Sequence, residues 1–116
     1  MLKKLSGLVF VIGLLAVIVL SVMPAEAIPK LGFPEILAHI AGYAALTGAG
    51  GIAFRDAKSL ILLAAGLILL GIGLELVQKL VPGRDSSGLE MLANIVGIAL
   101  GCAAAIAVNF VLKRRR

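Results

Sequence analysis

Four long apolar segments, each nearly free of charged residues, constrain this chain more than any other feature of its sequence. They span residues 5–23, 36–54, 59–81 and 91–112. About 20 helical residues, each rising about 1.5 Å, cross the roughly 30 Å hydrocarbon layer of a bilayer. A helix also satisfies its own backbone hydrogen bonds where water is absent. The sequence therefore predicts an all-α integral membrane bundle of four transmembrane helices.

The composition excludes an ordinary soluble domain. Of the 116 residues, 61% are hydrophobic and 15% are charged, whereas soluble domains are about 45–50% apolar and about 25% charged. A chain this short exposes much of its surface, so a soluble core could not hide this much apolar area. We expect one membrane domain over residues 1–116.

Basic residues gather at the two ends of the chain and in one short link, and this distribution predicts the orientation. The residues concerned are Lys3, Lys4, Arg55, Lys58 and the run 113–116. Because cytoplasmic loops carry an excess of Lys and Arg, we expect both termini and the link at 55–58 to lie in the cytoplasm. Four basic residues beside a membrane helix suit anionic lipid better than nucleic acid, which we do not expect as a partner.

The first segment leaves one alternative open. Residues 1–27 also resemble a secretory signal, with Lys3-Lys4, an apolar core and an Ala25-x-Ala27 ending. That core covers residues 5–23, which is longer than the usual length of about 7–15 residues. We therefore predict a retained helix. Cleavage would leave three spans, with the two ends on opposite sides of the membrane.

Polar residues that membrane helices normally avoid gather between residues 75 and 94. They include Glu75, Gln78, Arg84, Glu90 and Asn94. An ionisable group inside hydrocarbon costs about 2.5 kcal/mol or more, so such residues often mark functional sites. The stretch is a candidate site, and the alternative is a solvated loop between helices.

Helical periodicity places these polar residues on stripes with small residues. The stripes are Glu35, His39, Gly42, Tyr43, Leu46 and Gly50; Gly71, Glu75 and Gln78; and Glu90, Asn94, Gly97 and Gly101. We predict that the stripes meet, with His39 facing Glu75 or Asn94, and that Gly97 and Gly101 make the closest backbone approach. The alternative is that the polar groups only bond helices to each other.

Four motifs in this order resemble the VanZ-like family of small bacterial membrane proteins. They are Ser21-x-x-Pro24; Glu35-x-x-x-His39-x-x-x-Tyr43; Glu75-x-x-Gln78 with Pro82-Gly83-Arg84; and Glu90-x-x-x-Asn94-x-x-Gly97-x-x-x-Gly101. The resemblance runs from Ser21 to Gly101. The family usually has Asp where this chain has Glu35 and Glu90, so the carboxylates are kept on longer arms.

The resemblance implies a multi-pass protein of the bacterial cytoplasmic membrane. The family's namesake is associated with resistance to the glycopeptide teicoplanin, whose target is a peptidoglycan precursor. A role in the cell envelope or in antibiotic resistance is therefore what the resemblance implies for this chain.

Several candidate residues have side chains suited to chemistry or to binding. His39 could act as a general acid or base, or be an interior hydrogen-bonding group. Glu75 and Glu90 could be a catalytic carboxylate pair or part of an ion network. Arg84 could bind an anionic head group through two parallel hydrogen bonds, or pair with a carboxylate. Because a metal site usually has three or four protein ligands, one His with carboxylates predicts no metal, and we expect no cofactor.

We expect an outward-facing pocket that binds a membrane lipid, an anionic head group or a cell-envelope precursor. Its predicted ligand-binding residues are Tyr43, His39, Glu75, Gln78, Arg84, Glu90 and Asn94. The first alternative is an intramembrane enzyme acting on a lipid head group. The second is a small four-span exporter or a holin-like pore former. The sequence leaves open whether the chain catalyses a reaction and whether it forms a homo-oligomer.

Overall fold

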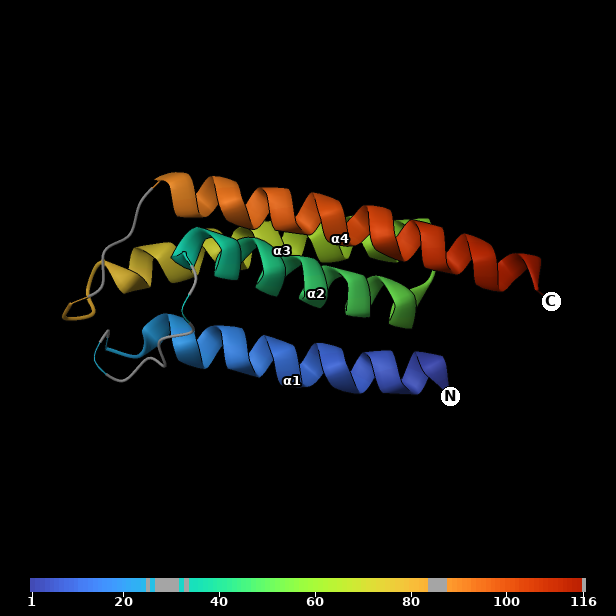
Figure 1. Cartoon of the computed structure of the whole chain (residues 1–116), viewed down its shortest axis with the longest axis horizontal. Coiled ribbons are helices and arrows are strands. Elements are labelled where there is room, and N and C mark those ends of the chain that lie inside the picture. The colour runs from blue at the N-terminus through green and yellow to red at the C-terminus, as the bar shows by residue number, and fades with distance from the viewer. Residues whose placement is uncertain (25, 27–31, 33, 84–87, 116) are drawn as a thin grey trace.

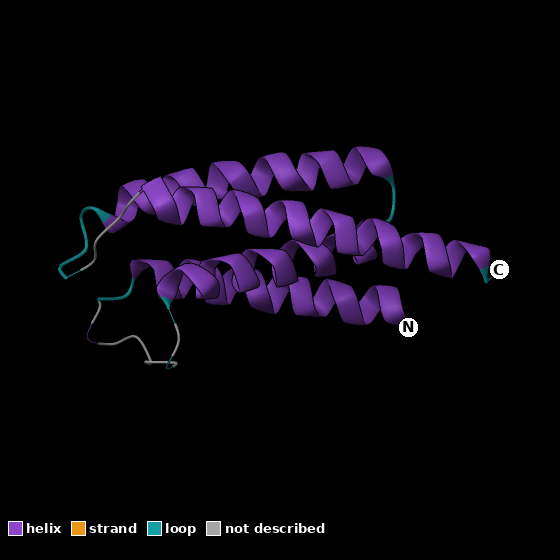
Figure 2. Cartoon of the chain, turned by 45° about the horizontal axis from the view of Figure 1, so that its top comes forward, coloured by secondary structure: helices purple, strands orange, loops and turns teal. Residues whose placement is uncertain are grey.

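The computed structural model describes residues 1–24, 26, 32, 34–83 and 88–115. These residues form four helices and no strand (Figures 1 and 2). The helices are α1 (Leu2–Val22), α2 (Glu35–Phe54), α3 (Ala57–Gln78) and α4 (Gly88–Arg114). All four are long and apolar enough to cross a membrane. The predicted all-α bundle of four candidate membrane spans is confirmed.

The helices run alternately up and down along one axis, in a bundle of about 51 × 22 × 21 Å. Both termini and the α2–α3 link lie at the same end, which we call the Arg55 end (Figure 1). The last turns of α1 and α3 and the first turns of α2 and α4 lie at the other end, which we call the His39 end. The common location of the termini agrees with four complete spans. The assignment of the Arg55 end to the cytoplasm stays a prediction.

Helix α1 lies at the edge of the bundle. Ser6 is its only buried residue among those described, and most of its Leu, Val and Ile side chains are exposed. The ring of Phe10 meets that of Phe54 on α2 edge-on, with centroids 6.0 Å apart. An apolar helix that is open on most sides is suited to lipid rather than water.

Helices α2 and α4 form the most extensive contact in the bundle. A Cβ atom built on Gly97 would lie 2.5 Å from the Ile40 carbonyl oxygen, and one built on Gly101 would lie 2.6 Å from that of Ala44. No side chain fits at such distances, so glycine lets the two backbones meet. The predicted close approach at Gly97 and Gly101 is confirmed.

The same contact continues further along α2 than the sequence predicted. A Cβ atom on Gly51 would come within 2.5 Å of the Ala105 side chain. One turn of α4 beyond Ala105, the Asn109 Nδ2 donates a hydrogen bond of 3.1 Å to the Gly51 carbonyl oxygen. The centre of the bundle is filled by an apolar core around Tyr43 and Leu46, against which Cys102 packs as a small residue.

Residues in the links before and after α3 explain where that helix begins and ends. Asp56 starts α3, because its carboxylate accepts hydrogen bonds from the backbone amide and the hydroxyl of Ser59 at 3.1 and 2.7 Å. Helix α3 ends at Gln78 rather than at the predicted residue 81, because the chain turns before Gly83, whose φ of 74° suits glycine. Helix α4 begins at Gly88, three residues before the predicted start at 91.

Candidate functional site

Buried polar residues gather toward the His39 end of the bundle. Glu75 and Gln78 lie in the last two turns of α3, and Glu90 and Asn94 lie in the first two turns of α4. As whole residues, all four are at most 8% exposed. Charged and amide groups are costly to bury without partners, so their grouping at one end of an apolar bundle singles out this region.

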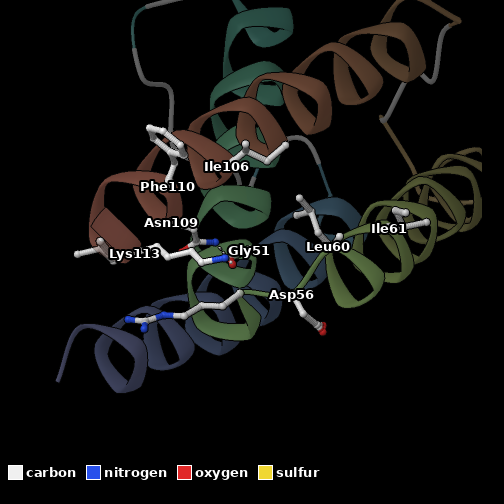
Figure 3. Close-up of a pocket in the computed structure, with 11 residues that line it drawn as sticks. Gly51, Asp56, Leu60, Ile61, Ile106, Asn109, Phe110 and Lys113 are labelled. Carbon is white, nitrogen blue, oxygen red and sulfur yellow. Dashed lines mark hydrogen bonds between the residues drawn. The ribbon is translucent and has the colours of Figure 1, made fainter. Parts of the chain in front are cut away.

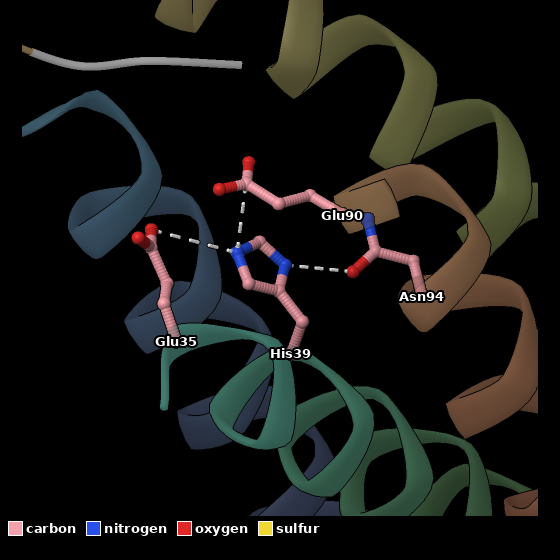
Figure 4. Close-up of polar contacts among 4 residues, drawn as sticks. All are labelled: Glu35, His39, Glu90 and Asn94. Atoms are coloured by element: carbon pink, nitrogen blue, oxygen red, sulfur yellow. Dashed lines mark hydrogen bonds and ion pairs between the residues drawn. The ribbon is translucent and has the colours of Figure 1, made fainter. Parts of the chain in front are cut away.

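His39 of α2 makes the best-defined polar contact in this region. Its Nδ1 lies 2.8 Å from the Asn94 Oδ1 (Figure 4). An amide oxygen only accepts hydrogen bonds, so Nδ1 carries the proton and donates. The other amide atom, Nδ2, faces α3, where it would lie 3.2 Å from a Cβ atom on Gly71. The structure confirms that His39 faces Asn94.

The other imidazole nitrogen of His39 points between two carboxylates. Nε2 lies 3.9 Å from the Glu35 Oε1 and 4.0 Å from the Glu90 Oε2 (Figure 4). Both distances exceed those of hydrogen bonds to nitrogen, which are about 2.7–3.2 Å. The Glu90 side chain is 9% exposed and that of Glu35 is 60% exposed. We call Glu35, His39, Glu90 and Asn94 the His39 cluster.

Two acceptor oxygens on α3 lack hydrogen-bond partners within the described part of the chain. They are the Glu75 Oε2 and the Gln78 Oε1. A buried acceptor without a partner loses its interaction with water and gains nothing in return. These oxygens can therefore accept hydrogen bonds from a ligand.

Tyr43 lies between the His39 cluster and the polar residues of α3. Its hydroxyl lies 3.5 Å from the position of a Cβ atom on Gly71, close to the amide of Asn94. Gly71 is one helical turn before Glu75 on α3. The absence of a side chain at Gly71 thus lets residues of α2 and α4 approach α3.

The structure brings most of the predicted site residues to one end of the bundle. His39, Glu90 and Asn94 meet directly, and Tyr43 lies beside Asn94. Arg84 lies outside the described residues. Glu35 belongs to the site although it was not among the predicted ligand-binding residues. Its spacing of four residues from His39 already placed it on the same helix face.

The described part of the site is rich in acceptors and negative charge. It holds the carboxylates of Glu35, Glu75 and Glu90, together with the unpaired amide oxygen of Gln78. Such a set favours hydroxyl groups, ammonium groups or metal ions. Glu35, His39 and Glu90 offer three ligand atoms that all lie within 4.8 Å of one another, so these residues could hold a metal ion.

Together, the fold and the site define a small helical protein with four candidate membrane spans and a carboxylate-rich polar cluster at one end of its bundle. Comparisons with known protein families, with curated proteins and with solved structures found no match.

Proposed function

We propose that the chain is a VanZ-like protein of the bacterial cytoplasmic membrane that binds a lipid head group or a lipid-linked envelope precursor. The observation that carries the proposal is the meeting of His39, Glu35 and Glu90 at the end of an apolar bundle. A ligand anchored in the bilayer by its lipid tail would present its polar part at about this depth. The family resemblance supports a role in the cell envelope and in glycopeptide resistance.

Different residues of the site suit different groups of the ligand. The carboxylates and the free oxygens of Glu75 and Gln78 suit hydroxyl or amine groups of a sugar, peptide or amino-alcohol. Arg84, six residues after the end of α3 in the sequence, is the residue that we expect to contact a phosphate. A zwitterionic or phosphate-linked head group would use both kinds of contact.

The test combines a cell phenotype with direct binding. Glu75→Gln and Arg84→Gln should each lower glycopeptide tolerance and reduce binding of a lipid-linked peptidoglycan precursor to the protein in nanodiscs. Lys58→Gln changes a charge at the opposite end and serves as the control. Full tolerance and full binding in both site variants, at normal membrane abundance, would contradict the proposal.

An intramembrane enzyme acting on a lipid head group is the second candidate. The hydrogen bond to Asn94 places the proton on the Nδ1 of His39 and leaves Nε2 of the neutral ring able to accept a proton. His39→Ala should then lower activity by about two to four orders of magnitude, whereas a binding protein should keep part of its activity. Release of a head group from a radiolabelled lipid is the measurement.

A further inference from the structure

We propose that Glu35, His39 and Glu90 form a site for one divalent transition-metal ion with the preferences of zinc. The ion would occupy the space between the His39 Nε2 and the two carboxylates in Figure 4. The role of the ion in holding a head group rests on the proposed function. Binding of the ion to the protein does not.

The spacing of the three ligand atoms fits a shared ion. Zinc lies about 2.0–2.2 Å from imidazole nitrogen and carboxylate oxygen, so two tetrahedral ligands of one ion lie roughly 3.3–3.6 Å apart. The Nε2 of His39 lies 3.9 and 4.0 Å from the two carboxylate oxygens. Small rotations of the two Glu side chains that move each oxygen by about half an ångström would close this difference.

The hydrogen bond between His39 and Asn94 supplies an independent argument. It fixes the proton on Nδ1 and leaves the lone pair of the neutral ring on Nε2. A histidine that binds a metal usually donates its other N–H to an oxygen in this way.

The donor set selects the kind of metal. Calcium and magnesium prefer sites made of oxygen, whereas an imidazole nitrogen with carboxylates suits zinc and neighbouring transition metals. Three protein ligands are also the number found at zinc sites that keep one position open. In this chain the open position could take a phosphate or hydroxyl oxygen of the bound head group.

The decisive experiment measures zinc binding to the full chain in nanodiscs after treatment with a chelator. Titration calorimetry with zinc alone should give one ion per chain. Glu35→Gln, His39→Ala and Glu90→Gln should each weaken binding at least tenfold, whereas Glu26→Gln should not. The Glu35 side chain is 60% exposed, so Glu35→Gln keeps the test valid if a variant at a buried position fails to fold.

Two results would overturn the proposal. One is no zinc binding by the chelator-treated protein, and the other is unchanged affinity in both Glu35→Gln and His39→Ala. The titration contains no envelope precursor, so its outcome is independent of the proposed function. Zinc binding without precursor binding would contradict the proposed function alone.

A separate observation at the Arg55 end supports a second inference. A cavity of about 580 Å³ lies between the end of α2, the start of α3 and the end of α4 (Figure 3). Leu60, Ile61, Ile106 and Phe110 form much of its apolar lining, and Arg55 and Lys113 also line it. We infer that this cavity binds an anionic phospholipid, with its phosphate near the two cations and one acyl chain along the apolar side chains.

The basic groups of this cavity are available to bind a phosphate. The Arg55 Nε is buried without a hydrogen-bond partner in the described part of the chain. The neighbouring carboxylate of Asp56 accepts its hydrogen bonds from Ser59. No described ion pair involves Arg55 or Lys113, and anionic lipid attracts basic residues beside a membrane helix.

Native mass spectrometry can test this lipid site. The chain in detergent should retain phosphatidylglycerol in preference to phosphatidylcholine, and Arg55→Gln and Lys113→Gln should each reduce that preference severalfold. Lys58→Gln, a charge change in the same region outside the cavity lining, should not. Equal retention of both lipids, or competition by soluble glycerol phosphate as effective as by the lipid, would overturn the inference.

Discussion

At the scale of single residues, one hydrogen bond organises the site. The bond from His39 to Asn94 sets which imidazole nitrogen faces Glu35 and Glu90. Asn94 is only 2% exposed, so water has little access to its side-chain amide. We therefore expect Asn94 to position His39 rather than to contact a ligand itself.

Replacement of Asn94 tests this positioning role. Asn94→Leu should lower the free energy of unfolding by about 1–3 kcal/mol, because it leaves the part-buried N–H of His39 without an acceptor. It should also weaken zinc binding. Asn94→Asp keeps an acceptor oxygen and should restore most of the zinc affinity. Equal zinc affinity in all three proteins would rule the role out.

The sequence alone predicts much of the site at this scale. The four-residue spacing from His39 to Tyr43 and from Glu90 to Asn94 places each pair on one helix face. Periodicity gives no distance between helices, so it could not decide whether His39 faces Glu75 or Asn94. It also could not show that Glu35 and Glu90, which lie 55 positions apart in the chain, converge on one nitrogen.

At the scale of the helices, glycine determines how closely α2 and α4 approach. Gly97 and Gly101 face the backbone of α2, whereas Gly66 of α3 has nothing within 4 Å of its Cβ position. The residue type is the same, but only the first two glycines lie in a helix contact. Sequence spacing identified that pair, and it missed Gly51 because its partner, Ala105, belongs to no glycine motif.

A matched pair of substitutions can distinguish two effects of replacing a glycine on stability, namely lost helix packing and changed helix propensity. Gly97→Leu should destabilise the bundle by about 1–3 kcal/mol or more, because the new side chain would meet the backbone of α2. Gly66→Leu makes the same chemical change in open space and should have little effect. Thermal unfolding in detergent measures both. Similar losses in the two variants would refute the packing explanation.

The start of α3 predicts a dependence on pH. Hydrogen bonds from Ser59 hold the pKa of the Asp56 carboxyl below its ordinary value of 3.8. A lowered pKa in the folded state means that the contribution to stability is present above that ordinary value and is lost as the pH falls through the folded-state pKa. Asp56→Ala should therefore be less stable than the native chain at pH 7, and the difference should vanish in strong acid. A difference independent of pH in thermal unfolding would contradict this assignment.

At the scale of the whole molecule, orientation is the principal prediction. The structure places the termini and the α2–α3 link at one end, and the positive-inside rule assigns that end to the cytoplasm. Reporter fusions after residues 57 and 116 should report the cytoplasm, and a fusion near residue 84 should report the outside. A cytoplasmic signal from the fusion near residue 84 would reverse the location of the site.

The unequal lengths of the helices have a mechanical consequence. Helix α2 has 20 residues and α4 has 27, which correspond to lengths of about 30 and 40 Å. A bilayer that matches α2 in thickness leaves the last turns of α4 in the head-group layer, where Lys113 and Arg114 are favoured. A change in bilayer thickness would then strain the shorter helices first, while α4 could slide within the head-group layer. Hydrophobic mismatch would therefore act on the α2–α4 contact, and the His39 cluster joins those same two helices.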